Sequence, residues 1–194
     1  NNRQDYHLAY EGTHGKNEYD LKVYHNRLGK HSYLGAGTGY NFDRAEYATS
    51  AVEGRVTYRA DESHTFTYGT EYRHLEAGST RYGGSRTDRF QSKGYSERGT
   101  DQYAFYGADE WKIGKKLLFV PSIRWDHHED FGSEWSPRAG LTYLMDDHNR
   151  FKVNYGFAYR APSLFERYGD MEETPVPYMT VIVYGNEDLR PEKT

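Results

Sequence analysis

The chain contains no cysteine, which excludes disulfide bridges, thiolate metal sites and a cysteine nucleophile within its 194 residues. It also lacks any apolar run near the ~18 residues that a membrane-spanning helix needs. The net charge of −4 provides no overall positive field that would attract nucleic acid. The residues after Asn1 do not show the charged and then apolar pattern of a signal peptide. These absences leave a soluble, a processed or a partial chain, or one that spans a membrane without helices.

Apolar residues are scarce, but aromatic residues are not. Hydrophobic residues make up 36% of the chain, whereas aromatic residues reach 16%, including 20 tyrosines. Disordered chains are poor in aromatic residues, so this composition argues against disorder. Tyrosine has an apolar ring and a polar hydroxyl, which suits surfaces that are apolar at one end and hydrated at the other.

The apolar residues recur with a period of two, which indicates β-strands. Over residues 149–160, Phe151, Val153, Tyr155, Phe157 and Tyr159 alternate with polar or small residues. A helix would scatter these five side chains around its circumference. The segment is therefore predicted to be one strand with an apolar and a polar face.

Similar alternation predicts eight strands, most of about ten residues, the length of a tilted strand that crosses a bilayer. Both faces of the strand Asp101–Trp111 carry apolar residues, so the sequence does not settle its orientation. Pro121 lacks an N–H, so we expect a bulge or a water-facing break at that point.

The predicted connections alternate between short and long. Those at 11–17, 60–63, 112–116 and 146–149 are short, whereas 26–46 and 74–100 are long and 126–134 is intermediate. Outer-membrane barrels have tight periplasmic turns and long outward loops. The predicted fold class is thus all-β, an antiparallel transmembrane β-barrel, with a soluble β-sandwich as the alternative.

In this barrel the even-numbered strands run outward, and Tyr159 and Arg160 lie at the external rim. Six tyrosines are expected to face lipid or the membrane interface. They are Tyr10, Tyr58, Tyr68, Tyr143, Tyr155 and Tyr159.

The C-terminal part of the sequence resembles the TonB-dependent outer-membrane receptor family. The resemblance covers 117–194 strongly and rests on an ordered series of short motifs, whereas 1–111 matches only in general barrel character. Its residues are Arg124, Trp125, Asp126, Phe131, Gly132, Ser136, Pro137, Arg138, Gly140, Leu141, Tyr159–Leu164, Gly185, Asn186, Leu189, Pro191, Glu192 and Lys193. Tyr159 stands where the family usually has Phe, and Glu187 where it usually has Pro.

The resemblance implies a 22-stranded barrel, an N-terminal plug and a short box that engages the inner-membrane TonB protein. Since the sequence shows about eight strands, no plug and no final strand, 1–194 is interpreted as an internal part of such a barrel. A complete eight-stranded barrel is the competing interpretation. The expected location is the bacterial outer membrane, the expected ligand is a ferric siderophore or haem, and no cofactor is expected.

The predicted long loop 75–100 is basic and aromatic. A ligand-capturing role would use charge steering and ring stacking on a flat, anionic iron complex. Its candidate ligand-binding residues are Arg81, Tyr82, Arg86, Arg89, Phe90 and Tyr95. An equally open alternative is a solvated loop whose arginines contact lipopolysaccharide phosphates.

A second candidate site lies between the Arg160-Ala161-Pro162 motif and the motif that contains Asn186, Leu189, Pro191 and Glu192. Arg160, Tyr178, Met179 and Tyr184 are its candidate ligand contacts. Haem receptors of the resembled family carry a His in this loop, and 163–185 contains none, which favours a siderophore over haem. The alternative is structural: the prolines end strands and Asn186 takes a turn.

His127 and His128 are adjacent, and neighbouring side chains on a strand point to opposite faces, so they are poorly placed to bind one metal ion. No catalytic triad spacing or phosphate loop is visible, and the chain is not expected to be an enzyme. The favoured function is energised import of an iron complex. The alternatives are a passive or adhesin-like barrel and a soluble β-sheet binding module or glycan enzyme.

Overall fold

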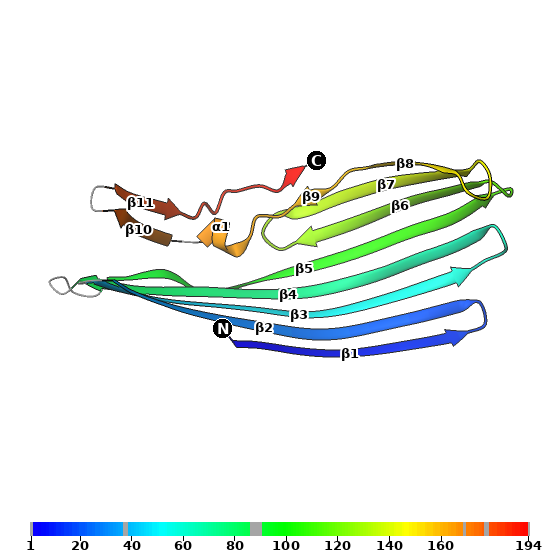
Figure 1. The fold of residues 1–194 in the computed structure, drawn as a ribbon. Coiled ribbons are helices and arrows are strands. Elements are labelled where there is room, and N and C mark those ends of the chain that lie inside the picture. Colours follow the sequence, from blue (N-terminus) through cyan, green and yellow to red (C-terminus); the bar gives the residue numbers. More distant parts are fainter. Residues whose placement is uncertain (1, 37–38, 86–90, 169, 177–178, 194) are drawn as a thin grey trace.

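The protein is described by a computed structural model that covers residues 2–36, 39–85, 91–168, 170–176 and 179–193, with side chains outside 31–44, 79–97 and 169–184. Eight strands form one antiparallel sheet in chain order (Figure 1). They are β1 Asn2–His14, β2 Asn17–Ala36, β3 Gly39–Arg59, β4 His64–Ser85, β5 Gln91–Ile113, β6 Leu117–His128, β7 Gly132–Leu144 and β8 Arg150–Gly156. The predicted number of strands and their antiparallel order are confirmed.

The remaining elements lie beyond the end of β8 and return toward it. They are β9 Tyr159–Arg160, α1 Leu164–Tyr168, β10 Asp170–Val176, β11 Met179–Tyr184 and β12 Glu192–Lys193. β10 and β11 pair as a hairpin, and β12 pairs with β9. None of the helices in the described part of the chain is long and apolar enough to cross a membrane.

The sheet has two chemically different faces, because the strand registers keep alternate residues together across all eight strands. We call one the aromatic face. Its exposed side chains include Tyr6, Leu8, Tyr10, Leu21, Val23, Val52, Tyr58, Phe66, Tyr68, Phe105, Trp111, Ile123, Trp135, Leu141, Tyr143, Phe151, Val153 and Tyr155. The opposite face, which we call the polar face, carries the charged residues that alternate with them.

No packed core lies within the described residues. The buried apolar side chains there are Ala51, Ala77 and Ala104, and no large side chain is fully buried. A sheet with one apolar face normally buries it against a second layer of structure. Here that face remains open, so its burial requires something outside the chain.

Four strands are much longer than predicted. β2, β3, β4 and β5 have 20, 21, 22 and 23 residues instead of about ten. Most residues of the predicted long loops 26–46 and 74–100 therefore belong to paired strands that extend beyond the aromatic face. The prediction failed because apolar residues are sparse in these parts of β4 and β5, and the alternation of Tyr40 and Phe42 in β3 covers only a few residues.

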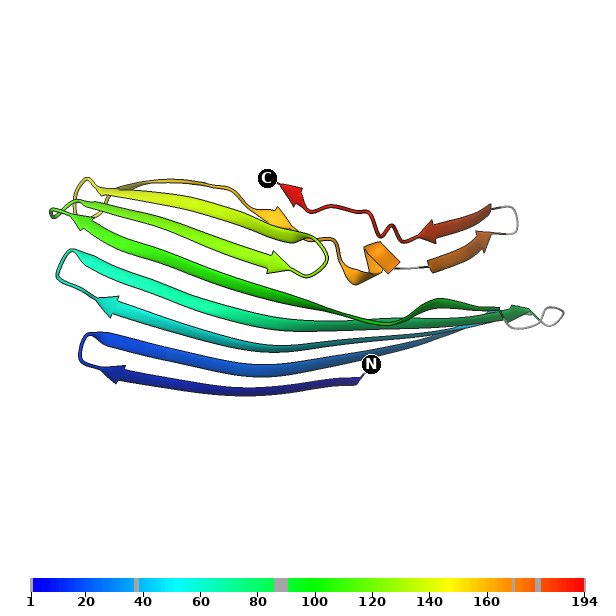
Figure 2. The same ribbon diagram turned by 180° about the vertical axis from the view of Figure 1, so that it is seen from behind.

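The four short connections, β1–β2, β3–β4, β5–β6 and β7–β8, all lie at one end of the sheet, as Figures 1 and 2 show. Gly15 and Gly114 take positive φ values of 60° and 63° in two of them, a conformation that glycine adopts without steric cost. In the other two, the carboxylates of Asp61 and Asp146 accept hydrogen bonds from backbone N–H groups two and three residues later. The predicted grouping of the short connections at one end is confirmed, whereas most residues of the connections predicted to be long belong to strands.

Pro121 does not produce a bulge. The register of β5 against β6 is the same on both sides, with Ala108 opposite Ser122 and Trp111 opposite Phe119. Only the two intervening pairs, which involve Asp109 and Glu110, are missing. Because proline has no N–H, the Asp109 carbonyl has no ladder donor there. The result is a local gap in hydrogen bonding within a continuous strand.

The strand predicted over 149–160 is also interrupted. β8 ends at Gly156, and Tyr159 pairs with β12. The half-buried Tyr159 lies among polar-face groups, near Arg124 and Asp126. Its predicted position on the lipid-facing side is wrong, because the break after Gly156 resets the alternation. The other five tyrosines predicted there do lie on the aromatic face.

Candidate functional site

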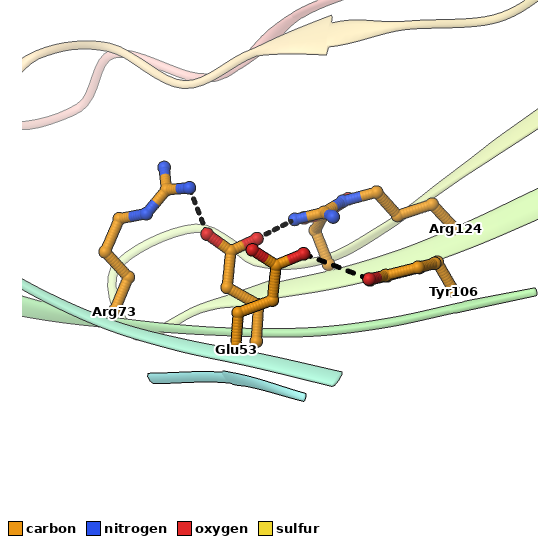
Figure 3. A network of polar contacts seen from close by, with 6 residues as sticks. Glu53, Arg73, Tyr106 and Arg124 are labelled. Atoms are coloured by element: carbon orange, nitrogen blue, oxygen red, sulfur yellow. Dashed lines mark hydrogen bonds and ion pairs between the residues drawn. The ribbon is translucent and has the colours of Figure 1, made fainter. Parts of the chain in front are cut away.

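The polar face carries a network of ion pairs around Glu71 on β4. Arg73 and Arg124 both pair with its carboxylate, the latter with Nη2 2.9 Å from Oε2. The Nε of Arg124 donates a second hydrogen bond of 2.8 Å to Asp126. A single guanidinium on β6 thus joins two carboxylates, which is the geometry that favours arginine over lysine. Figure 3 shows Arg73 and Arg124 meeting at the carboxylate that they share.

Tyr106 extends this network to β3. Its hydroxyl donates a hydrogen bond of 3.1 Å to Glu53, and Arg124 lies 5.7 Å from the centre of its ring. The ring passes over Gly69 on β4, where a Cβ atom would lie 2.6 Å from ring atoms and from the carbonyl oxygen of Gly54. Glycine at position 69 is therefore what lets the tyrosine reach across the intervening strand.

Further ion pairs continue toward the short-turn end of the polar face. Arg55 pairs with Asp20, and Arg59 lies 2.6 Å from Glu18. Each of these pairs bridges β2 and β3. Charges of both signs therefore alternate along the face, which can be hydrated or covered by polar polypeptide but not by hydrocarbon.

The first motif of the C-terminal region forms a helix cap. Ser163 precedes α1, and its hydroxyl accepts a hydrogen bond of 3.2 Å from the Glu166 N–H. The Glu166 carboxylate accepts a bond of 2.7 Å from the Ser163 N–H in return, which makes a reciprocal capping box. These contacts and the Arg160 guanidinium 2.6 Å away lower the pKa of the Glu166 carboxyl to about 2.

The two C-terminal motifs lie together. Tyr159 and Arg160 pair antiparallel with Lys193 and Glu192, and the Arg160 guanidinium is 3.5 Å from the Glu192 carboxylate. In the second motif, the Asn186 side chain accepts a hydrogen bond of 3.0 Å from the Asp188 N–H and forms a turn. Ala161 and Pro162 lie between β9 and α1, and Leu189 and Pro191 lie between that turn and β12.

Most of the predicted ligand contacts fall where no side chain is described. The backbones of Arg81 and Tyr82 belong to β4, that of Tyr95 to β5, and those of Met179 and Tyr184 to β11. Arg86, Arg89, Phe90 and Tyr178 lie outside the described residues. Arg81, Tyr82 and Tyr95 thus lie on the parts of β4 and β5 far from the short turns, which we call the outer arms of the sheet. Met179 and Tyr184 lie on the β10–β11 hairpin, and no described pocket contains these five residues.

The adjacent histidines point to opposite faces. His127 stacks on Trp125 with ring centres 5.8 Å apart, on the aromatic face. His128 is buried and lies 4.4 Å from the Phe131 ring. Among the described residues no group of three or more His, Cys, Asp or Glu side chains is placed to hold a metal ion.

Sequence reasoning recognised the polar face but not the contacts within it. The available signal was the opposite charge of Glu71, Arg73, Arg124 and Asp126 at positions that alternate with aromatic residues. Which of them meet depends on the register between β4, β5 and β6, which short motifs do not encode.

The chain that forms this sheet, with its open aromatic face and its paired C-terminal motifs, matches a known family. The family described as TonB dependent receptor-like, beta-barrel matches residues 1–194. The chain belongs to this family. The resemblance on which the sequence analysis relied is thereby confirmed.

Curated relatives match shorter stretches. The chain is 28% identical over 64 residues to the ferric enterobactin receptor of Pseudomonas aeruginosa, covering 33% of the chain and 9% of that protein. It is 27% identical over 111 residues to the heme/hemopexin utilization protein C of Haemophilus influenzae, covering 54% of the chain and 16% of that protein. The chain thus spans only a small part of the length of these relatives.

A solved structure supports the fold over nearly the whole chain. The siderophore receptor PirA from Pseudomonas aeruginosa superposes with a TM-score of 0.73 at 16% identity, covering 98% of this chain and 34% of that one. At this identity the likeness concerns the fold alone, and it agrees with the open, antiparallel eight-stranded sheet of Figure 1.

Proposed function

We propose that the chain is part of an outer-membrane receptor that binds a scarce iron complex and imports it with energy from the TonB system. The observation that carries this proposal is a single sheet, of a TonB-dependent receptor family member, with one face aromatic and exposed and the other crossed by ion pairs. In a barrel wall the first face meets lipid and the second lines the lumen.

The distribution of apolar side chains along the sheet supports the membrane location. The exposed apolar side chains begin near the short turns, at Tyr58, Phe66 and Trp111, and the sequence of β4 and β5 far from these turns is rich in polar residues and glycine. Aromatic residues are enriched at membrane interfaces, where ring and polar group meet different surroundings. The short turns then face the periplasm, and the long arms extend outside the cell.

The arms would bring the first contacts to the ligand. Arg81, Tyr82, Arg86, Arg89, Phe90 and Tyr95 belong to the arm formed by β4 and β5 and its tip. Arginines at the end of a projecting hairpin attract an anionic complex from a distance, and aromatic rings stack on it at contact. Tyr178, Met179 and Tyr184 of the neighbouring hairpin are proposed as further contacts.

A ferric siderophore is favoured over haem as the ligand. The segment 163–185 contains no His that would coordinate haem iron, although one relative is named for heme and hemopexin utilization. Energy transfer from TonB and a plug inside the barrel are part of the proposal, as is contact of outer basic residues with lipopolysaccharide.

The test uses the full-length receptor purified in detergent. Ferric enterobactin and haem are titrated separately, and uptake of radioactive iron is measured in cells with and without TonB. We expect saturable siderophore binding that is tighter than haem binding, and uptake only with TonB. Nanomolar haem binding without a siderophore response would reverse the ligand, and TonB-independent uptake would favour a passive barrel.

A further inference from the structure

Arg167, on the short helix α1, is buried at the outer rim, and its exposed fraction is 8%. Its guanidinium lies between two aromatic rings, 4.8 Å from the centre of Phe131 and 4.8 Å from that of Tyr168. Its Nη1 lies 2.6 Å from the carboxylate of Asp130, in the connection between β6 and β7. The charge is therefore paired and stacked at once, an arrangement that suits the planar guanidinium.

The carboxylate that pairs with Arg167 is itself held by the sheet. The hydroxyl of Thr100 on β5 donates a hydrogen bond of 2.9 Å to the same Asp130 oxygen. The Asp130 N–H donates a bond of 3.1 Å to Nδ1 of His128 at the end of β6. Thr100 and His128 are both buried. Arg167 is thus attached to a fixed point of the sheet.

The returning chain also meets Arg167. Its Nη2 lies 3.4 Å from the carbonyl oxygen of Glu187, and the Asn186 N–H donates a bond of 3.0 Å to the Glu166 carbonyl. At Gly185 a Cβ would lie 2.3 Å from the Arg167 carbonyl oxygen, so only glycine permits this approach. The segment between these contacts is the β10–β11 hairpin, whose far end thus meets the Arg167 side chain at Glu187 and the α1 backbone at Gly185 and Asn186.

The hairpin projects from this point over the outer arms. β10 runs close to β5, and the two views place the hairpin beyond α1 at the outer end of the sheet (Figures 1 and 2). We propose that Arg167 is a positioning residue that fixes the β10–β11 hairpin relative to the β4–β5 arm, so that the two present one preorganised surface to the ligand. This rests on the proposed function, because it assigns a role in ligand capture.

Removing the side chain has a predictable structural effect. Without Arg167 the Asp130 carboxylate loses its counter-charge, and the rings of Phe131 and Tyr168 lose the group between them. The hairpin keeps its own strand pairing, and Arg98 on β5 still lies over the Tyr168 ring, but the ion pair that links α1 to Asp130 is lost. Its orientation therefore broadens, and ordering it again on binding weakens affinity.

The first experiment measures the position of the hairpin in the full-length receptor. The chain has no cysteine of its own, so spin labels are placed at Glu172→Cys on β10 and Ser133→Cys on β7, and any cysteine elsewhere is replaced. Arg167→Ala is expected to broaden the distance distribution, and Arg167→Lys to broaden it less. Arg190→Ala is the matched control, because Arg190 is exposed and forms no ion pair with the described residues. An unchanged distribution in Arg167→Ala overturns the proposal.

The second experiment measures ferric enterobactin affinity for the same variants. We expect a loss on the order of tenfold for Arg167→Ala, partial recovery for Arg167→Lys and no change for Arg190→Ala. A broadened hairpin with unchanged affinity overturns the role in capture. If the unsubstituted receptor binds no iron complex, the proposed function fails, and the distance measurement still decides whether Arg167 positions the hairpin.

Discussion

The hydroxyl of Tyr106 on β5 donates a hydrogen bond of 3.1 Å to the carboxylate of Glu53 on β3, with one strand between them. The contact is possible because the intervening position is Gly69, over which the ring lies. β3 and β5 are thereby joined by side chains across β4 on the polar face, in addition to the ladders that pair each of them with β4. This crossing also brings the Tyr106 ring close to Arg124 and the carboxylates that it pairs with (Figure 3).

Gly69→Ala should disrupt this crossing. The new Cβ would lie 2.6 Å from the Tyr106 ring and from a backbone oxygen, so both the ring and the strand must shift. We expect a loss of about 1–3 kcal/mol, typical of overpacking, seen as a lower unfolding temperature of the full-length receptor. Gly54→Ala is the control, since a Cβ there meets open space. Equal stability of the two variants would contradict the crossing.

Arg124→Lys should be more harmful than Arg59→Lys. Arg124 binds two carboxylates through separate nitrogens, which a single ammonium reproduces poorly, whereas among the described residues Arg59 pairs with one carboxylate, that of the partly exposed Glu18. We expect about 1–3 kcal/mol for Arg124→Lys and at most about 1 kcal/mol for Arg59→Lys. Denaturation of both receptors under identical detergent and salt conditions measures the difference, and a larger effect at Arg59 would refute the assignment.

Pro121→Thr should close the gap in the β5–β6 ladder. Threonine supplies an N–H to the Asp109 carbonyl without changing the register, and it favours strands. The expected gain is about 0.5–1.5 kcal/mol, accompanied by slow hydrogen exchange at the new amide. Val120→Thr provides the comparison, because it introduces threonine at the neighbouring position of β6 without adding a backbone N–H. Rapid exchange at position 121 would show that the ladder stays open.

The capping box predicts an acid-sensitive helix. The hydrogen bond from the Ser163 N–H, with the Arg160 and Ser163 side chains, lowers the Glu166 pKa from 4.5 to about 2. Because the folded-state pKa is the lower one, this stabilisation is complete above pH 4.5 and is lost as the pH falls toward about 2. Amide exchange over 164–168, corrected for intrinsic rates, should therefore accelerate in this window. Glu166→Gln should flatten that dependence, and an unchanged pH profile in the variant would exclude the mechanism.

The predicted features that depend on alternation were recovered, and those that depend on long-range pairing were not. Tyr155 and Phe151 show the period of two directly, so strand identity and face could be inferred from neighbours along the chain. Tyr159 follows the same pattern but lies on the polar side, because β9 pairs with β12 after a break that apolar spacing does not reveal. The outer parts of β2–β5 were mistaken for loops because, outside an apolar environment, a strand does not need apolar alternation.

The sequence by itself determined the strand type, the number of strands in the sheet, the grouping of the short turns at one end, and the family, since each follows from local spacing or an ordered motif series. Only the tertiary structure decided that Arg160 meets both Glu166 and Glu192, that Tyr106 crosses Gly69, and that Arg167 pairs with Asp130. Those contacts join residues that are brought together by strand register and chain return. A shift of one residue in any ladder would turn the same side chains to the opposite face.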